Sequence, residues 1–460
     1  MSLNPRVSIV SLGCSRNDVD SQELAGRLAA DGWNLVSDGE DTDVILVNTC
    51  GFIEQAKKDS IDTILEAREL LDGNGKIVAV GCLAERYGNE LAAELPEADA
   101  ILSFDDYSDI GATLRKVLAG DKIVAHTPGD RRQLLPISPV ERQSVSAQVA
   151  TPGMGPHVYR KRLESGPWAP LKIASGCDRR CTFCAIPAFR GSFVSRDPGE
   201  IFEEAAWLGE NGVRELLLVS ENSTSYGKDL GDLRLLEKLL PLLVQPEGIE
   251  WVRVSYLQPA EMRPDLISVI ANTTGIVPYF DLSFQHASNS VLRRMKRFGG
   301  TDSFLDLLSA IRIHNPLAGT RTNVIVGFPG ETEQDIAELI EFIQGARLDA
   351  VGVFAYSDEE GTAAVKHDGH ISPSEIESRH EEVSKIALRV SEDVARSRIG
   401  QEVCVLIEEI GNLGRSEHQG PEVDGSTTVL SDEQFRVGEF VRAVVTDSIG
   451  VDLVARQTSP

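Results

Sequence analysis

Short apolar runs alternate with amphipathic stretches through the first 125 residues of the chain. The apolar runs, which are typical of buried strands, lie at 6–12, 43–48, 76–80 and 100–102. Stretches with apolar residues at every third or fourth position, as in helices buried on one face, follow them at 20–31, 53–71, 85–95 and 110–118. This alternation predicts an N-terminal α/β domain over residues 1–126, built on an open parallel sheet.

The next stretch has little periodicity. Seven prolines lie between Thr127 and Pro170, among Gly, Ser, Gln and Arg residues. This composition indicates a Pro-rich linker or an extended wrapping segment over residues 127–168.

Strand and helix signals then return. Six strand candidates occur at 171–174, 215–220, 251–255, 279–284, 321–327 and 350–355. Amphipathic helices follow most of them, and a long one at 371–398 comes last. Because a full TIM barrel has eight such units, residues 169–396 are expected to form a partial (β/α)6 TIM-like barrel.

The last 60 residues change character again. Apolar alternation at 402–408, 427–430 and 440–447 is separated by Gly-rich turns and includes no helix pattern. The pattern predicts a small C-terminal all-β barrel over residues 397–460. The expected fold class is therefore α/β, with three domains.

Composition indicates the cellular location of the protein, the roles of its cysteines and the charge of its partners. No stretch approaches the roughly 20 apolar residues of a membrane helix, and the N-terminus lacks the apolar core of a signal peptide. A cytoplasmic protein without a membrane is therefore expected. Seven cysteines in 460 residues favour metal or catalytic roles over a disulfide framework. The net charge of −26 disfavours nucleic acid and either attracts a basic partner or serves solubility alone.

Three cysteines, Cys177, Cys181 and Cys184, have the spacing C-x3-C-x2-C. Three such thiolates can hold three irons of a cubane cluster and leave the fourth iron open for chemistry. A zinc site is the alternative, but it needs a fourth Cys or His nearby, and His157 and His286 lack ligand-like spacing. The motif, with Phe183 before its last cysteine, resembles the signature of the radical S-adenosylmethionine (SAM) enzymes.

A second trio, Cys14, Cys50 and Cys82, is dispersed in sequence, but each member directly follows a predicted strand. The carboxyl ends of parallel strands meet at one edge of a sheet, so the three thiols are expected to converge on a second cluster with an open iron. Three buried core cysteines are the alternative. The seventh cysteine, Cys404, lies in an apolar strand pattern and is expected to pack in a core.

Five further residues are candidate cofactor contacts because they lie at predicted strand ends. In the resembling enzymes, polar groups at such strand ends touch SAM, and a glycine-rich turn like the one that begins at Gly327 lies near the methionyl part of SAM. The candidates are Glu221, Asn222, Gln285, His286 and Gly327. The alternatives are a helix-capping turn for the Glu-Asn pair, a structural role for His286, and an ordinary βα turn at Gly327.

Two cysteine trios in this order, followed by a small barrel, resemble the radical SAM methylthiotransferases over nearly the whole chain. Several stretches are similar to the ribosomal, RimO-type branch, which modifies an aspartate: GCDRRCTFCAIP, FDLSFQHAS, NVIVGFPGETE, YSDEEGTAA and GPEVDG. In this branch the terminal barrel is a TRAM-like domain that recruits the substrate. Ser-Glu-Asn at 220–222 departs from the Gln-Asp type of pair more usual in the family.

The resemblance implies a sulfur-group transferase that adds a methylthio group to the β-carbon of an aspartate in small-subunit ribosomal protein twelve. The implied cofactors are two [4Fe-4S] clusters and SAM, which serves as methyl donor and as radical source. The catalytic trio would be Cys177, Cys181 and Cys184, and the other trio would hold the auxiliary cluster. The implied partners are the ribosomal protein or its subunit, an electron donor such as flavodoxin or ferredoxin, and a sulfur source.

Two alternatives remain: a tRNA adenosine methylthiotransferase and a non-catalytic iron–sulfur protein that docks on the ribosome. The terminal barrel, residues 397–460, carries eleven acidic residues, five arginines and no lysine. A barrel that grips tRNA should be basic, so a basic protein is the better match and no direct tRNA contact is expected. Glu422 and Asp424, in the GPEVDG turn, are expected to contact that protein.

Overall fold

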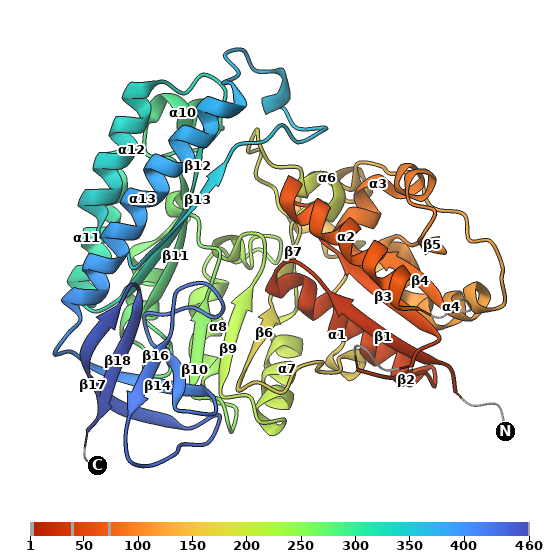
Figure 1. The fold of residues 1–460 in the computed structure, drawn as a ribbon, viewed down its shortest axis with the longest axis horizontal. Coiled ribbons are helices and arrows are strands. Elements are labelled where there is room, and N and C mark those ends of the chain that lie inside the picture. The colour runs from red at the N-terminus through yellow and green to blue at the C-terminus, as the bar shows by residue number, and fades with distance from the viewer. Residues whose placement is uncertain (1–3, 38–40, 72–74, 459–460) are drawn as a thin grey trace.

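The N-terminal region of the computed structural model, which describes residues 4–37, 41–71 and 75–458, is a parallel sheet between two layers of helices (Figure 1). The sheet order is β2 (Asn34–Leu35), β1 (Arg6–Ser11), β3 (Val44–Thr49), β4 (Lys76–Val80) and β5 (Ala100–Ile101). The helices are α1 (Ser15–Ala30), α2 (Glu54–Leu70), α3 (Gly81–Glu94) and α4 (Ile110–Leu118). Apolar residues of α1 and α4 pack on one face, and those of α2 and α3 pack on the other. The predicted open parallel sheet is confirmed.

Helix α1 begins five residues before the predicted start at Asp20. The apolar spacing typical of a buried helix is absent from its first turns, because the buried side chains there are polar. Asn17 and Asp20, for example, are 1% and 0% exposed. These side chains bond to groups outside the helix, so burial here follows polar partners rather than apolar spacing.

The Pro-rich segment is a strap with short helical turns, among them α5 (Pro139–Arg142). Three buried arginines fasten it to the regions on either side: Arg131 to Glu85 (2.9 Å), Arg142 to Asp178 (2.8 Å) and Arg160 to Gln22 (2.8 Å). A buried guanidinium needs such partners, so the segment holds the first two regions together.

The central region contains six strands in two three-stranded parallel sheets: β6 (Trp168–Lys172), β9 (Glu215–Val219) and β10 (Trp251–Val254), then β11 (Tyr279–Gln285), β12 (Gly319–Val326) and β13 (Ala350–Ala355). Isolated parallel bridges, Val252 to Ile276 and Leu257 to Leu282, join the two sheets. The predicted partial six-stranded barrel is confirmed.

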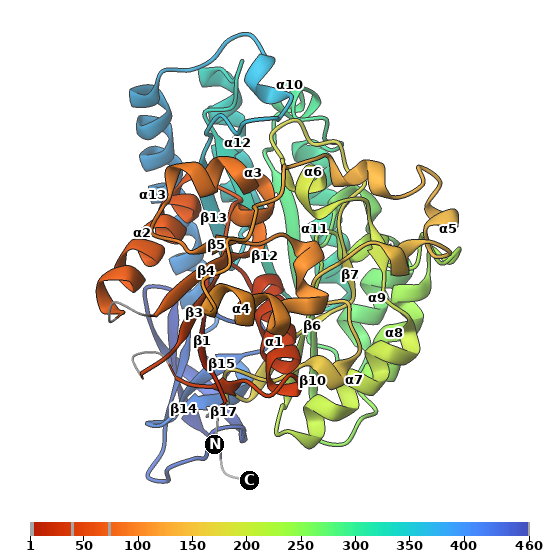
Figure 2. The same ribbon diagram turned by 90° about the vertical axis from the view of Figure 1, so that its right-hand side faces the viewer.

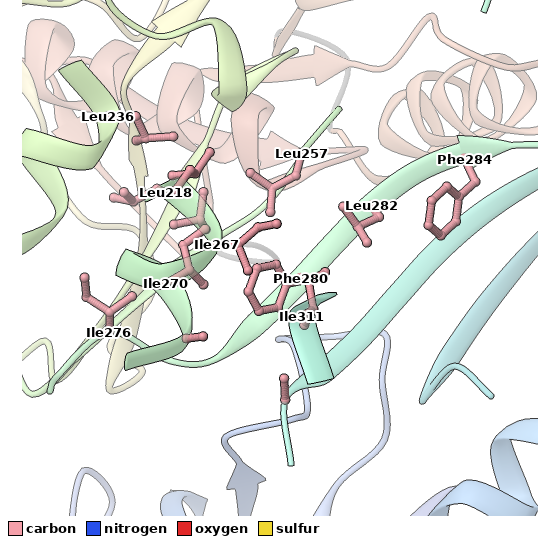
Figure 3. Close-up of a cluster of buried hydrophobic side chains, with 14 of the residues drawn as sticks. Leu218, Leu236, Leu257, Ile267, Ile270, Ile276, Phe280, Leu282, Phe284 and Ile311 are labelled. Carbon is pink, nitrogen blue, oxygen red and sulfur yellow. The ribbon is translucent and has the colours of Figure 1, made fainter. Parts of the chain in front are cut away.

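Helices cover the outside of this partial barrel: α7 (Pro198–Glu210), α8 (Leu235–Leu243), α9 (Pro264–Asn272), α10 (Asn289–Arg294), α11 (Thr301–His314), α12 (Glu333–Ala346) and α13 (Pro373–Ser397). Their starts follow local chemistry. Asp197 caps α7 by accepting from the N–H of Gly199 at 2.7 Å, and Thr332 and Asp335 form a capping box on α12. Figure 3 shows the core where strand residues such as Leu218 and Phe280 meet helix residues such as Ile267.

The C-terminal region is a closed barrel of β14 (Glu402–Glu409), β15 (Leu413–Ser416), β16 (Thr427–Leu430), β18 (Asp452–Gln457) and β17 (Phe440–Ile449). The sequence pattern missed β15 and β18. The barrel lies below the core strands in Figures 1 and 2, against their amino ends. Trp251 and Tyr279, which open β10 and β11, pack there against Leu406, Phe440 and Cys404. Cys404 is therefore in a core, as expected, but at the junction.

Buried charges also join the barrel to the core. Glu215 lies between Arg253 at 2.6 Å and Arg415 at 2.7 Å. Asp424 accepts from the hydroxyl of Tyr279 and pairs with Arg321 at 3.0 Å. The expectation that Asp424 contacts a partner protein is wrong, because this carboxylate is buried in the junction.

No helix within the described parts of the chain combines the length and the apolar character that a membrane span requires.

Candidate functional site

The first cysteine trio lies on a loop between two short strands. This loop leaves β7 (Ala174–Ser175) and returns to β8 (Val194–Ser195), which pairs antiparallel with β7. A Cβ at Gly176, whose φ is +77°, would lie 2.2 Å from the carbonyl oxygen of Ser192. Only glycine allows the loop to close so tightly, which gathers Cys177, Cys181 and Cys184 ahead of α6 (Ile186–Arg190).

The loop is anchored on the helical side of the core. The N–H of Thr182 donates to the carbonyl of Met295 at 3.1 Å, and its hydroxyl donates to that of Arg294 at 2.8 Å. The N–H of Arg179 points at the sulfur of Cys177 at 3.4 Å. These bonds fix the backbone that carries the thiols.

The second trio converges at the carboxyl edge of the N-terminal sheet. Cys14 precedes the first turn of α1, Cys50 follows β3, and Cys82 is in the first turn of α3. A Cβ at Gly13, whose φ is +104°, would lie 2.9 Å from the sulfur of Cys50. Glycine beside Cys14 therefore lets two of the three loops touch.

The thiols of each trio affect one another electrostatically. Burial, with the charges of Cys82 and Cys14, raises the pKa of Cys50 to about 11. Burial and the charge of Cys181 raise the pKa of Cys184 to about 12. Burial acts on Cys14 too, but the adjacent Arg16 outweighs it and the pKa of Cys14 falls below the ordinary value. Such mutual effects require short separations, so each trio is a true cluster of thiols.

Neither trio has the geometry of a single-ion site. Within the described ranges, no three His, Cys, Asp or Glu side chains stand close enough to share one metal ion. In a cubane each thiolate binds a different iron, so its ligands stand further apart than those of zinc. A zinc site would need a fourth ligand beside each trio, whereas a cubane with an open iron needs only three thiolates.

One arginine connects the two trios. Arg190, at the end of α6, donates to the sulfur of Cys82 at 3.0 Å and to Asp20 of α1 at 2.6 Å. Lys172 of β6 donates to the same carboxylate at 2.6 Å, and all three charged groups are buried. The sheet that carries the second trio is thus docked directly against the loop that carries the first.

A pocket with about 1180 Å³ of empty space, including its open mouth, lies between the two regions. The thiols Cys177, Cys181 and Cys184 line it on one side. The N-terminal region contributes Arg16, Phe52 and Ile53, which flank the second trio, and the strand ends contribute Glu221, Tyr256, Gln258, Ser283, Gln285, Asn323 and Tyr356. A substrate in this pocket would therefore contact the first set of cysteines and the residues that flank the second set.

The pocket accommodates only some of the candidate cofactor contacts. Glu221 and Gln285 line it, and one oxygen of Glu221 is buried without a hydrogen-bond partner in the described structure. Asn222 is buried in the turn that follows, where it bonds to Ser225 at 2.8 Å. His286 is fully buried, 3.3 Å from Glu331, and Gly327 donates its N–H to the same glutamate at 2.9 Å. These last three residues do not line the pocket.

The unpartnered oxygen of Glu221 tests whether the site fits SAM. A buried carboxylate oxygen lacking a donor is costly unless a ligand supplies one. The ammonium group of SAM is such a donor, and three adjacent thiols suit a cluster with an open iron. The residues present therefore fit both groups.

Several pocket residues were not predicted. Tyr256 and Ser357 come directly after core strands, and the same positional rule applied to every strand would have found them. Arg16 could also have been found from the sequence. A basic residue in the first turn of a helix is unfavourable beside the positive end of the helix dipole, which suggests that it has another role. Arg190 carried none, because only the docking of the two regions brings it to Cys82.

Asp18, a partly buried carboxylate of α1, should make the stability of the folded protein depend on pH. Burial, with the charges of Glu422 and Glu164, raises the pKa of Asp18 to about 6 against the opposing effect of the hydrogen bond from Ser11. The pKa of Asp18 is higher in the folded protein than in the unfolded chain. Ionised Asp18 therefore destabilises the folded state above about pH 6, and this destabilisation disappears below about pH 4. Replacing it with asparagine should raise stability by roughly 1–2 kcal/mol at pH 8 and by nothing at pH 4.

Thermal unfolding of Asp18→Asn at both pH values measures this difference. The matched control is Asp62→Asn, at an exposed position of α2. Equal stabilisation of Asp18→Asn at pH 4 and pH 8 would contradict the assignment.

Three stretches match known families. Residues 6–103 match the Uncharacterized protein family UPF0004, residues 171–343 match the Radical SAM superfamily, and residues 399–457 match the TRAM domain. The chain is 59% identical to the ribosomal protein uS12 methylthiotransferase RimO of a Nocardioides species, over 98% of this chain and 96% of that relative. It is 57% identical to the protein of that name from Streptomyces avermitilis, over 98% and 96%.

A solved structure shares the fold. The radical SAM methyltransferase TsrM from Kitasatospora setae, with tryptophan and a SAM analogue bound, aligns with a TM-score of 0.53. The alignment covers 76% of this chain and 73% of that one, at 13% identity.

Proposed function

The chain belongs to the radical SAM family of ribosomal protein uS12 methylthiotransferases, and from this premise we propose that it replaces a β-carbon hydrogen of an aspartate in uS12, small-subunit ribosomal protein twelve, with a methylthio group. The enzyme uses SAM and [4Fe-4S] clusters. The proposal rests chiefly on one pocket, which is lined by the thiols of Cys177, Cys181 and Cys184 and by Arg16, Phe52 and Ile53, the neighbours in sequence of Cys14 and Cys50.

Each trio has a separate role. Cys177, Cys181 and Cys184 hold the cluster that binds SAM, and Cys14, Cys50 and Cys82 hold the auxiliary cluster. When bound, SAM and the two clusters supply the radical that removes hydrogen and the sulfur and methyl groups that replace it. The chain's own residues position these groups and the substrate.

Apolar side chains form part of the pocket wall, where a bound substrate would cover them and displace water. Phe52 and Ile53 contribute from the N-terminal region, and Ile325 and Phe354 contribute from the core. A dry pocket protects a radical from side reactions. Glu221 serves the cationic end of SAM, because its free oxygen can accept from an ammonium group.

Ion pairs hold the pocket closed on one side. Glu359, in the loop after β13, accepts from Lys57 at 3.1 Å and from Arg86 at 2.9 Å. Both cations belong to the N-terminal region, and the carboxylate is buried. These two ion pairs fix the position of the N-terminal region, which carries the auxiliary cysteines, relative to the core.

The substrate must be large if it meets both the barrel and the pocket. The barrel packs on the amino ends of the core strands, whereas the pocket opens at their carboxyl ends. The longer core strands β11, β12 and β13, of seven, eight and six residues, separate the two by roughly 20 Å. A small molecule cannot reach both places, but a loop of a ribosomal protein can.

The acidic barrel favours uS12 over tRNA, because a basic protein complements its charge and a phosphate backbone does not. The remaining partners follow from the chemistry: flavodoxin or ferredoxin as electron donor, and a separate sulfur source. We place the reaction in the cytoplasm, without direct tRNA contact.

Exposed Glu422 tests the docking surface. Its replacement by lysine should weaken uS12 binding roughly threefold to tenfold at low salt and less at high salt, since exposed charges are screened. Titration of the full-length holoenzyme with uS12 at two ionic strengths measures the effect. Glu341→Lys, at an exposed position of α12, is the matched control. Unchanged uS12 binding by Glu422→Lys at low salt would contradict this docking surface.

The function itself is tested with competing substrates. The anaerobically reconstituted enzyme is given SAM, reductant, uS12 and bulk tRNA, and tandem mass spectrometry follows both substrates. We expect a methylthio group on one aspartate of uS12. Methylthiolated adenosine in tRNA, with unmodified uS12, would contradict the proposal.

A further inference from the structure

Three arginines line the pocket, and two of them donate to oxygen acceptors of the protein. Arg179 pairs with Glu261. Arg297 donates to the side chain of Gln258 at 2.5 Å and to the carbonyl of Ser283. Their guanidinium groups are occupied by protein acceptors.

Arg16 differs from both. Its Nε donates to the sulfur of Cys14 at 3.5 Å, which is its single hydrogen bond within the described chain. Its Nη1 stands 3.8 Å from the carboxylate of Glu221, beyond hydrogen-bonding distance. The side chain is only 13% exposed and lines the pocket, and the four N–H groups of its Nη1 and Nη2 have no hydrogen-bond acceptor within the described chain.

The guanidinium is nevertheless held in a fixed plane. Its central carbon lies 4.6 Å from the centre of the Tyr256 ring. Tyr256 has a φ of +60°, which is rare for a residue with a Cβ and marks stored strain at functional sites. The N–H of Tyr256 donates to Asp281 at 2.9 Å, and Asp281 pairs with Arg321 at 3.3 Å. The platform under Arg16 is therefore built into the core.

A flat guanidinium with spare donors at a pocket wall is a bidentate site for a carboxylate. Arg16 touches a ligand of the auxiliary trio, Cys14, and faces Glu221 at the SAM side. It therefore stands where the target carbon must lie, between the source of the radical and the source of sulfur. The β-carbon of an aspartate is bonded directly to its carboxylate.

We propose that Arg16 binds the side-chain carboxylate of the substrate aspartate and so selects an acidic side chain for modification. This inference rests on the proposed function and names the specificity residue of the same pocket. Glu221 would repel an incoming carboxylate, but a cationic group on its free oxygen removes that repulsion. Binding of the aspartate should therefore be tighter when SAM is present.

The test compares the uS12 loop as a peptide with aspartate or asparagine at the target position. Full-length holoenzyme, matched for iron content, is titrated with each peptide in the presence of SAM and without reductant. We expect the unsubstituted enzyme to prefer aspartate by about tenfold to a hundredfold, since a charge-assisted bidentate pair is lost with asparagine. Arg16→Met should remove this preference, and Arg16→Lys should restore part of it. Arg179→Met should keep it.

The outcomes separate the inference from the function on which it rests. Should Arg16→Met retain the aspartate preference, or weaken SAM binding alone, the inference is overturned while methylthiolation of uS12 by the unsubstituted enzyme still supports the function. Should the methionine variant fail to take up iron, Arg16→Lys decides, because it keeps the charge beside Cys14. Its aspartate preference should fall about tenfold, and an unchanged preference overturns the inference.

Discussion

Replacement of Cys14, Cys50 and Cys82 by alanine should abolish methylthiolation and still allow release of 5′-deoxyadenosine from SAM. These thiols lie outside the loop that carries the radical trio, and Arg190, near the end of that loop, contacts Cys82 without any shared ligand. Iron should fall from about eight to about four per chain, since each cubane holds four. Iron analysis, chromatography of 5′-deoxyadenosine and mass analysis of the substrate measure the three quantities.

The matched variants define the outcome. Loss of Cys177, Cys181 or Cys184 should stop both reactions, and Cys404→Ala should stop neither, because this thiol packs at the barrel junction. Full methylthiolation without Cys14, Cys50 and Cys82 would overturn the division of roles. An iron content of about four in the unsubstituted protein would show that the auxiliary cluster does not form.

Replacement of Asp20 by alanine should destabilise the protein by roughly 3–5 kcal/mol, because it leaves the buried cations Lys172 and Arg190 without their shared counter-charge. Asp20 belongs to α1, and both cations belong to the central region. The variant should therefore also loosen the docking of the N-terminal sheet. Denaturant unfolding monitors the first effect, and limited proteolysis of the Pro-rich strap monitors the second.

The exposed pair of Asp393 with Arg396 on α13 supplies the control, since such pairs contribute little. Asp393→Ala should leave unfolding and proteolysis within error. If Asp20→Ala behaved in the same way, the buried network would not be what joins the two regions.

The sequence correctly predicted the strands and helices whose apolar residues recur at one regular spacing. Strands such as β4 and β13 and helix α4 begin and end where their apolar patterns do. The convergence of Cys14, Cys50 and Cys82 also followed from topology, because parallel strands place their carboxyl ends together. The candidate site could be found for the same reason.

The misses share a cause: burial that depends on partners distant in sequence. The polar first turns of α1 are buried against other regions, which hid the start of the helix. Asp424 looked like a surface acid in a Gly-rich turn, but Arg321 and Tyr279 bury it. His286 at a strand end looked like a pocket residue, yet Glu331 holds it in the core. Sequence spacing carries no information about such pairs.

A deuterium label on the substrate aspartate shows directly which hydrogen the enzyme removes. The uS12 substrate is labelled with deuterium at the aspartate β-carbon and given to the reduced holoenzyme with SAM. We expect one deuterium in the released 5′-deoxyadenosine. The other deuterium should remain on the β-carbon, beside the new methylthio group. Unlabelled 5′-deoxyadenosine alongside methylthiolated product would contradict it, because hydrogen removal would then not occur at that carbon.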